Sequence, residues 1–445
     1  MSKKSMKKIL SLAFAATAAC VLAGGASATD LLSVYRAAVG YDAQFASARA
    51  SVEAGREKLP QGRAGLLPSI GLNASTVWNE SETTSRAITS AVDYNSNTWT
   101  VTLTQPLFRW QNWVAYRQSE LAVAVAETQF GASRIDLILR VAQAYFDVLL
   151  AQDTLSTALA QKTAIAEQLE SARRNFDVGT STIVDTHEAQ ARFDLVEAQE
   201  IAAQNDLAVK RYALQTLTGQ VPDALRPLRR NAAMTAPQPA DMDQWVAVAE
   251  SGATAVQIAQ VGLEIARREI EKQRAGHYPT LDLVATRGHS AQGYSVTTGA
   301  GVESKSGTFG LQLSLPLFTG GSVSSKDREA VALQEKAAAD LDTARRSAAL
   351  AARQAYLGIA SGLSQIKAFE AALESSQSAL ASNKLGYEVG VRVNIDVLNA
   401  QSQLYDTRQK LAKARFDTLM ALFRLKAAAG TLSEDEIKAV NLMLE

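Results

Sequence analysis

Four segments of the chain alternate apolar and polar residues with a period of two. Such alternation is typical of β-strands with one apolar and one polar face. Each segment has roughly 9–12 residues, a length that crosses a bilayer as a tilted strand. The pattern therefore predicts two β-hairpins, over residues 66–105 and 279–316. The apolar positions are Ile70, Leu72, Ala74, Thr76 and Trp78; Trp99, Val101 and Leu103; Leu281, Leu283 and Ala285; and Phe309, Leu311, Leu313 and Leu315.

Each hairpin is followed by a proline and then by a long segment with few helix breakers. Pro106 and Pro316 are expected to end the strands, because proline cannot donate a hydrogen bond to the ladder. Residues 111–175 contain no Pro and one Gly, and residues 322–385 contain no Pro and two Gly. A helix of roughly 65 residues is on the order of 100 Å long.

Both long helical segments are expected to turn back on themselves. The breaks are predicted near Gly179 and Gly390, and the return helices end at Gly219 and Gly430, where glycine suits a helix end. The sequence thus predicts long helical hairpins over residues 111–219 and 322–430.

The order of elements recurs because the sequence is duplicated. Arg63-Ala64-Gly65 returns 211 residues later as Arg274-Ala275-Gly276, and Phe176-Asp177-Val178-Gly179 returns as Tyr387-Glu388-Val389-Gly390. Two copies of a unit this long indicate a tandem duplication rather than a solenoid. The expected organisation is a first repeat over 29–240, with an opening helix at 30–64 and a Pro-rich joint at 220–240, and a second repeat over 241–445, with an opening helix at 241–275 and a C-terminal segment at 431–445.

The return helix of the second repeat carries two apolar stripes with a seven-residue period. Stripes on adjacent heptad positions lie about 100° apart, so this helix needs a neighbour on each side. A closed ring of helices satisfies that need, and an ordinary coiled-coil bundle is the alternative. The stripes are Leu398, Tyr405, Ala412 and Leu419, and Val397, Leu404, Leu411 and Leu425.

The four predicted strands cannot stand alone in lipid. An open sheet leaves backbone groups unpaired at its edges, and about eight strands are the fewest that close a membrane barrel. We therefore expect the chain to oligomerise, giving eight, twelve or sixteen strands. The helices would join the same ring and enclose a conduit.

The first 28 residues have the pattern of a secretory signal peptide. Four Lys precede an apolar run, Ile9–Ala23, and Ala26-Ser27-Ala28 is a small-x-small cleavage site. The run is too short for a spanning helix. A retained anchor and a lipoprotein signal ending at Cys20 are the alternatives. Residues 29–445 would then carry 41 basic and 45 acidic side chains and no Cys.

Composition and motifs exclude several classes of function. The full chain has 45 basic and 45 acidic residues, and a nucleic-acid binder would show a basic excess. One Cys rules out a disulfide framework. No phosphate loop, catalytic triad or paired metal-ligand motif occurs. We expect neither an enzyme nor a cofactor or metal site. Trp78 and Trp99, near strand ends, are interpreted as interfacial anchors.

Taken together, these features resemble the TolC family of outer-membrane efflux and type I secretion channels. The resemblance rests on the duplication, on Gln105-Pro106-Leu107-Phe108 and Leu315-Pro316-Leu317-Phe318, and on the turn segments Phe176–Asp185 and Tyr387–Asn399. It implies a mainly α fold with a β-barrel part. Three chains would form a 12-strand outer-membrane barrel, with four strands per chain, continuous with a 12-helix periplasmic α-barrel. The joint and the C-terminal segment would form an equatorial belt.

The resemblance also implies partners and a gate. The partners are two further copies, a periplasmic adaptor, an inner-membrane pump of the ABC or RND type, and outer-membrane lipid. At the periplasmic mouth, Tyr387 and Arg392 correspond to donors, Asp185 to their acceptor and Asp396 to an acid of a constricting ring. This chain departs from the family at Asn399, where a second ring acid is expected.

Alternatives remain open for the gate, for the function of the whole chain and for the cargo. Glu188 holds the place matching Asn399 in the first repeat and would compensate for the missing acid. Without the resemblance, Arg392 and Asp396 are an exposed pair one helical turn apart, which contributes little. For the whole chain, the alternative function is a soluble periplasmic helical scaffold or adaptor, which the four alternating strands disfavour. The cargo stays open between drugs, metals and secreted protein.

Overall fold

The fold is described by a computed structural model that covers residues 29–445, apart from 86–87, 222–223, 230–231, 233 and 296–298. The predicted signal peptide, residues 1–28, and part of the predicted joint lie outside the described residues. The chain divides into two compact units. The strand unit comprises residues 49–131 and 254–346, and the helical unit comprises residues 29–48, 132–253 and 347–445.

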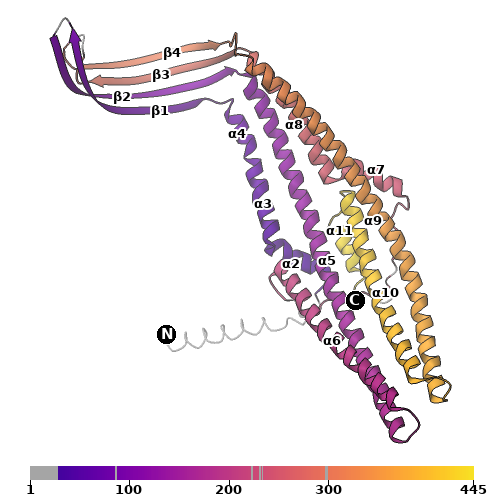
Figure 1. Cartoon of the computed structure of the whole chain (residues 1–445). Helices are drawn as coiled ribbons and strands as arrows, with labels where there is room; N and C mark the ends of the chain where they lie inside the picture. The colour runs from indigo at the N-terminus through magenta and orange to yellow at the C-terminus, as the bar shows by residue number, and fades with distance from the viewer. Residues whose placement is uncertain (1–28, 86–87, 222–223, 230–231, 233, 296–298) are drawn as a thin grey trace, which may run out of the picture. The chain divides into compact units, whose positions relative to one another are not determined.

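One antiparallel sheet of four strands dominates the strand unit (Figure 1). The strand order follows the sequence, so β2 of the first repeat pairs directly with β3 of the second. Trp99 on β2 lies opposite Ala74 on β1 and His289 on β3. Both predicted hairpins are present and merge into one sheet. The strands are β1 Ser69–Ser85, β2 Ile88–Phe108, β3 Thr280–Gln292 and β4 Val302–Ser314.

The strands are longer than the alternating runs suggest, and one proline does not end its strand. β2 continues to Phe108, beyond Pro106, which pairs with Asp282. The strand register shifts between Pro106 and Phe108, and such an irregularity tolerates a residue that cannot donate to the ladder. The expectation that Pro106 ends the strand is wrong. Pro316 lies two residues beyond the end of β4 at Ser314, as expected.

The sheet of the single chain leaves its apolar side chains uncovered. Trp78 is 78% exposed, Phe309 77% and Ile70 71%. The outer strands, β1 and β4, each pair with one neighbour in the described sheet, so both have an open edge. An isolated sheet of this kind is unfavourable, because open apolar edges pair with other chains. The sheet therefore has the properties of one part of a larger assembly.

An ion pair between an exposed arginine and a buried carboxylate joins β2 to β3 at one end of the sheet. Arg109 directly follows β2, and its Nε and Nη2 atoms donate to the two carboxylate oxygens of Asp282 on β3, at 2.8 and 2.6 Å. The side chain of Asp282 is only 8% exposed. A buried carboxylate needs such a partner, and the bidentate geometry is the strongest form of this contact. The pair joins the start of α5 to the second repeat.

The helices follow the predicted order, and they are interrupted at more places than the sequence suggested. In the described part of the chain, no helix is both long and apolar enough to cross a membrane. Their bounds are α2 Leu31–Tyr41, α3 Ala43–Arg56, α4 Lys58–Ala64, α5 Trp110–Asp177, α6 Ile183–Thr218, α7 Met242–Gly252, α8 Thr254–Arg274, the 3-10 turn η1 Ala275–His277, α9 Ser322–Glu388, α10 Asn394–Ala428 and α11 Glu434–Asn441.

Both predicted opening helices, at 30–64 and 241–275, are divided into shorter helices. In the first repeat, Asp42 interrupts the helix, and its carboxylate caps the next helix by accepting from Phe45 N at 2.7 Å. Arg140 donates to both oxygens of the same carboxylate, at 2.8 and 3.0 Å. These bonds from Arg140 hold the pKa of Asp42 below its usual range. In the second repeat, extended backbone at Ala253 separates α7 from α8.

In the helical unit the two predicted stripes of α10 lie in the core. Ala412 is half-buried, and the other members of the two stripes are buried: Leu398, Tyr405 and Leu419, and Val397, Leu404, Leu411 and Leu425. Three segments distant in sequence also meet here. Thr29 bridges to Leu225 of the joint, and Leu228 bridges to Leu444 of the C-terminal segment. Tyr145 Oη donates to Arg226 O at 2.9 Å and secures this crossing on α5.

Candidate functional site

The candidate site consists of the two turns that end the long helical hairpins, and both have the same backbone design. Gly179 and Gly390 have left-handed φ angles of 77° and 80°. After α5, Gly179 N donates to Phe176 O and Thr180 N to Asn175 O. After α9, Gly390 N donates to Tyr387 O and Val391 N to Gly386 O. This is the Schellman motif, in which glycine allows the chain to leave the helix without strain.

The return helices begin differently, and the difference decides what the two predicted acids do. Thr182 caps α6 in a capping box: Asp185 N donates to Thr182 Oγ1 at 3.4 Å, and Thr182 N donates to Asp185 Oδ2 at 3.0 Å. The Thr182 hydroxyl also donates to Asp185 Oδ2 at 2.9 Å. Val393 holds the matching place before α10 and makes no side-chain cap. The carboxylate of Asp396, the counterpart of Asp185, is therefore not engaged by a capping hydroxyl.

Asp396 pairs instead with Arg392 of its own chain. Arg392 Nη1 lies 3.5 Å from Asp396 Oδ2, one turn along the helix, and the two side chains are 59% and 34% exposed. Tyr387 Oη accepts from Asn175 Nδ2 at 3.1 Å, which ties the two turns together. Within the single chain, neither Tyr387 nor Arg392 is paired with the carboxylate of Asp185. The predicted donors and acceptor are near the same two turns but are not bonded to each other.

The remaining two predicted gate residues lie on facing return helices. Asn399 of α10 is exposed, and its Oδ1 accepts from Arg192 Nη2 of α6 at 3.0 Å. Glu188 is half-buried on α6. Where the family was expected to place a second acid, this chain therefore has an amide that joins the two repeats.

The structure adds a buried contact that the sequence analysis missed. Gln168 Nε2 of α5 donates to Asn394 Oδ1 at 2.6 Å, and Asn394 Nδ2 donates to the backbone oxygen of Asp185 at 3.0 Å. Asn394 is fully buried. One sequence signal could have indicated it, because Gln161, Gln168 and Asn175 recur every seven residues on a helix whose packing face should be apolar.

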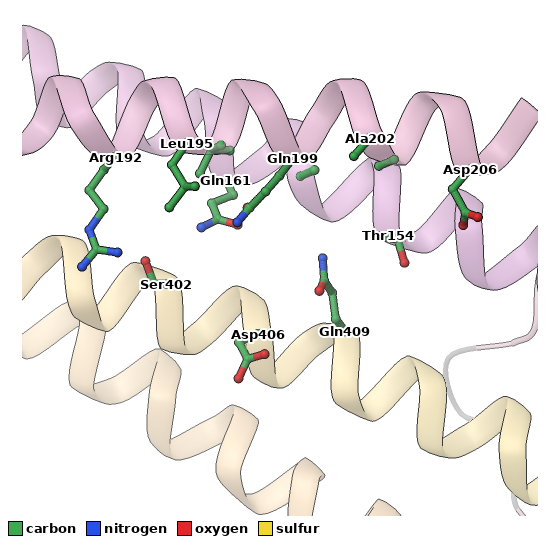
Figure 2. A pocket seen from close by; sticks show the side chains of 13 residues that line it. Thr154, Gln161, Arg192, Leu195, Gln199, Ala202, Asp206, Ser402, Asp406 and Gln409 are labelled. Carbon is green, nitrogen blue, oxygen red and sulfur yellow. The ribbon is translucent and has the colours of Figure 1, made fainter.

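A groove of about 560 Å³ lies beside these contacts, between α6 and α10, with α5 as its floor. Figure 2 shows Arg192 of α6 and Gln409 of α10 pointing into the space between the two helices. Asp406 is paired with Lys410 at 2.6 Å. The polar side chains that line the groove are Thr154, Gln161, Arg192, Gln199, Asp206, Ser402, Asp406 and Gln409.

The groove brings together two hydroxyls, several amides, two carboxylates and one guanidinium. In the part of the chain that the structure describes, no three His, Cys, Asp or Glu side chains are grouped so that they could hold a metal ion. The chemistry of the turns and groove is that of breakable polar contacts between helices.

Comparison with known proteins gives the same picture over almost the whole chain. The sequence model of the family described as outer membrane efflux protein matches residues 34–220 and 245–431, once for each repeat. The outer membrane protein TolC of Vibrio cholerae is 33% identical over 445 residues, covering 99% of both chains. The alkaline protease secretion protein AprF of Pseudomonas aeruginosa is 34% identical over 443 residues, covering 98% of this chain and 91% of that protein.

The same fold occurs in a solved structure. The outer membrane protein VceC of Vibrio cholerae superposes with a TM-score of 0.74, covering 90% of this chain and 96% of that one, at 22% identity. At this identity the likeness establishes the fold. The mainly helical architecture with a four-stranded sheet and a two-fold repeat is thereby confirmed.

Proposed function

The chain belongs to the outer membrane efflux protein family, and from that premise we propose that it is the exit duct of a tripartite efflux or type I secretion system. It is an outer-membrane protein, as its relatives are. The duct is a passive conduit, and the proposal includes no catalytic activity. The alternative of a soluble periplasmic scaffold is set aside, because the relatives over the full length are outer-membrane proteins.

The observation that carries the proposal is the open four-stranded sheet. Its apolar side chains are exposed and its two outer strands lack a second neighbour. A membrane-spanning sheet must close on itself, and four strands are too few. We propose that three copies join β1 of one chain to β4 of the next, giving twelve strands in contact with lipid. Trp78 and Trp99 are exposed, but they lie near the middle of β1 and β2 rather than near the strand ends as expected, because both strands continue well beyond the alternating runs. Their role as anchors at the membrane surface stays a proposal.

The turns at Gly179 and Gly390 form the periplasmic mouth of the assembled duct. In the assembly, Arg392 and Tyr387 are proposed to reach Asp185 across neighbouring hairpins, and Asp396 lines the constriction. The weakness of the Arg392–Asp396 pair inside the chain supports this, because an exposed pair at 3.5 Å leaves Arg392 free to exchange partners at little cost.

The duct works with an adaptor in the periplasm and a pump in the inner membrane. The names of the relatives include both protease secretion proteins and an efflux protein. This range of names supports a conduit whose cargo is set by the pump that delivers it. No nucleic acid takes part.

A ring of Asp396 carboxylates predicts a cation-dependent block. Three copies of one acid around an axis attract multivalent cations. In planar bilayers the wild-type protein should form pores whose current is blocked by a trivalent cation added to the periplasmic side. Asp396→Ala should raise the blocking concentration severalfold.

Asp342→Ala provides the matched control for this measurement. Asp342 pairs with Arg346 in the same exposed arrangement, one helical turn apart, but lies on α9 far from the turn in sequence. This variant should be blocked like the wild type. Pores of normal conductance whose block is unchanged in Asp396→Ala would contradict the ring, and an absence of pores would contradict the proposed function.

A further inference from the structure

Among the polar contacts between the two repeats at the turns, one differs from the others in its burial. The contact between Arg192 and Asn399 is exposed, and the contact between Asn175 and Tyr387 is half-buried. Asn394, by contrast, is 0% exposed, and its amide both accepts from Gln168 and donates to Asp185 O. Breaking an exposed contact returns its groups to water, whereas breaking a buried one leaves polar atoms without a partner. The hydrogen bonds of Asn394 are therefore the ones that resist an exchange of partners.

The contact joins the two repeats, and the matching positions carry no second copy of it. The position matching Asn394 in the first repeat is Ile183, which is 44% exposed, and the position matching Gln168 in the second is Ala379. A residue needed only to start a helix would serve equally in both copies. The amide pair is therefore specific to the junction of α5, α6 and α10, and helix formation alone does not account for it.

Asn394 also lies between the predicted gate residues. It is two residues after Arg392 and two before Asp396, and its side chain is bonded to the backbone of Asp185. Because Val393 provides no side-chain cap, the first turn of α10 is not fixed by its own N-cap. The bond to Asp185 O instead sets the position of that turn relative to α6.

We infer that Asn394 is a positioning residue of the periplasmic mouth: its buried amide, held by Gln168, fixes Arg392 and Asp396 at a defined height relative to Asp185. The inference rests on the proposed function, because it assumes that the turns form the mouth. Asn394 itself does not line the proposed constriction. It acts by holding Arg392 and Asp396 in the positions that they occupy in the closed mouth.

The test is single-channel conductance in planar bilayers. Asn394→Ala should raise the conductance above that of the wild type, because the turn of α10 loses its fixed position. Gln168→Ala removes the same bond from the side of α5 and should have the same effect, which keeps the test valid should Asn394→Ala fail to fold. The double variant Gln168→Asn with Asn394→Gln swaps the two amide side chains and keeps their combined length. Its conductance should return toward the wild-type value.

A double variant separates positioning from a general loss of stability. If Asn394 acts by placing Arg392, then Asn394→Ala combined with Arg392→Ser should raise the conductance by less than the product of the two single effects. Gln401→Ala is the matched control, because Gln401 is a buried amide seven residues further along α10, and its Oε1 has no partner in the described structure. Its conductance should equal that of the wild type.

The outcomes distinguish the inference from the proposed function. Wild-type protein that forms no pore overturns the proposed function and the inference with it. Wild-type pores together with unchanged conductance in both Asn394→Ala and Gln168→Ala overturn the inference alone. A lower melting temperature without a conductance change also overturns it, since it indicates a structural role. Effects that multiply fully in the double variant mean that Asn394 does not act through Arg392.

Discussion

Replacing Arg109 with leucine should lower the melting temperature of the detergent-solubilised protein by several degrees. The substitution removes both bonds to the carboxylate of Asp282, whose side chain is 8% exposed, and leaves a buried charge without a partner. Because Arg109 itself is 40% exposed, we expect the cost to be that of leaving one buried polar group without its partner, about 1–3 kcal/mol. The loss should also impair assembly, because the pair fixes the start of α5 to β3 of the second repeat.

The matched comparisons are a double variant and an exposed pair. Arg109→Leu combined with Asp282→Leu removes both charges and should recover much of the lost stability, because no buried charge is then stranded. Lys336→Ala disrupts an exposed pair with Asp340 on α9 and should shift the melting temperature little. A melting temperature for Arg109→Leu equal to that of Lys336→Ala would show that the pair of Arg109 and Asp282 is not a stabilising clamp.

Replacing Arg392 with serine should raise the single-channel conductance severalfold. Within its own chain Arg392 makes only a long, exposed pair with Asp396, so its removal should cost the isolated chain little stability. In the proposed trimer, the periplasmic mouth loses three guanidinium groups, one from each chain. Each of them is proposed to bridge to Asp185 of a neighbouring hairpin. The closed end should therefore loosen while the barrel stays intact.

Arg346→Ser is the control for this variant. Arg346 forms the same exposed pair one helical turn apart, with Asp342, and lies on α9 far from the turn in sequence. Its conductance should match the wild type. Equal conductance of Arg392→Ser and Arg346→Ser would remove Arg392 from the gate, and a loss of pore formation in Arg392→Ser alone would assign it to assembly instead.

The fold could be predicted from the sequence where its signals are local. The strands around Trp78, Trp99 and Phe309 follow from alternation with a period of two, which a sheet with one apolar face imposes on any sequence. The long helices follow from runs without proline. The duplication is visible because residues such as Gly179 and Gly390 meet the same backbone requirement, a left-handed φ, in both copies.

The features that the sequence did not reveal depend on partners far along the chain. Asp42 breaks a helix while bonded to Arg140, 98 residues away, and Gln168 meets Asn394 across 226 residues. β2 passes through Pro106, and its register with β3 shifts between Pro106 and Phe108. For the gate, the family resemblance predicted which positions carry the donors and acids, but it did not predict their bonds. In the structure Thr182 bonds to Asp185, whereas Val393 has no such side chain and Asp396 pairs with Arg392.

The central claim is that copies of this chain complete one another's sheets to form a membrane pore. Native mass spectrometry of protein extracted from the outer-membrane fraction tests it most directly. The account predicts a complex of three chains that requires detergent to stay in solution. A single chain that remains soluble in buffer without detergent would contradict it.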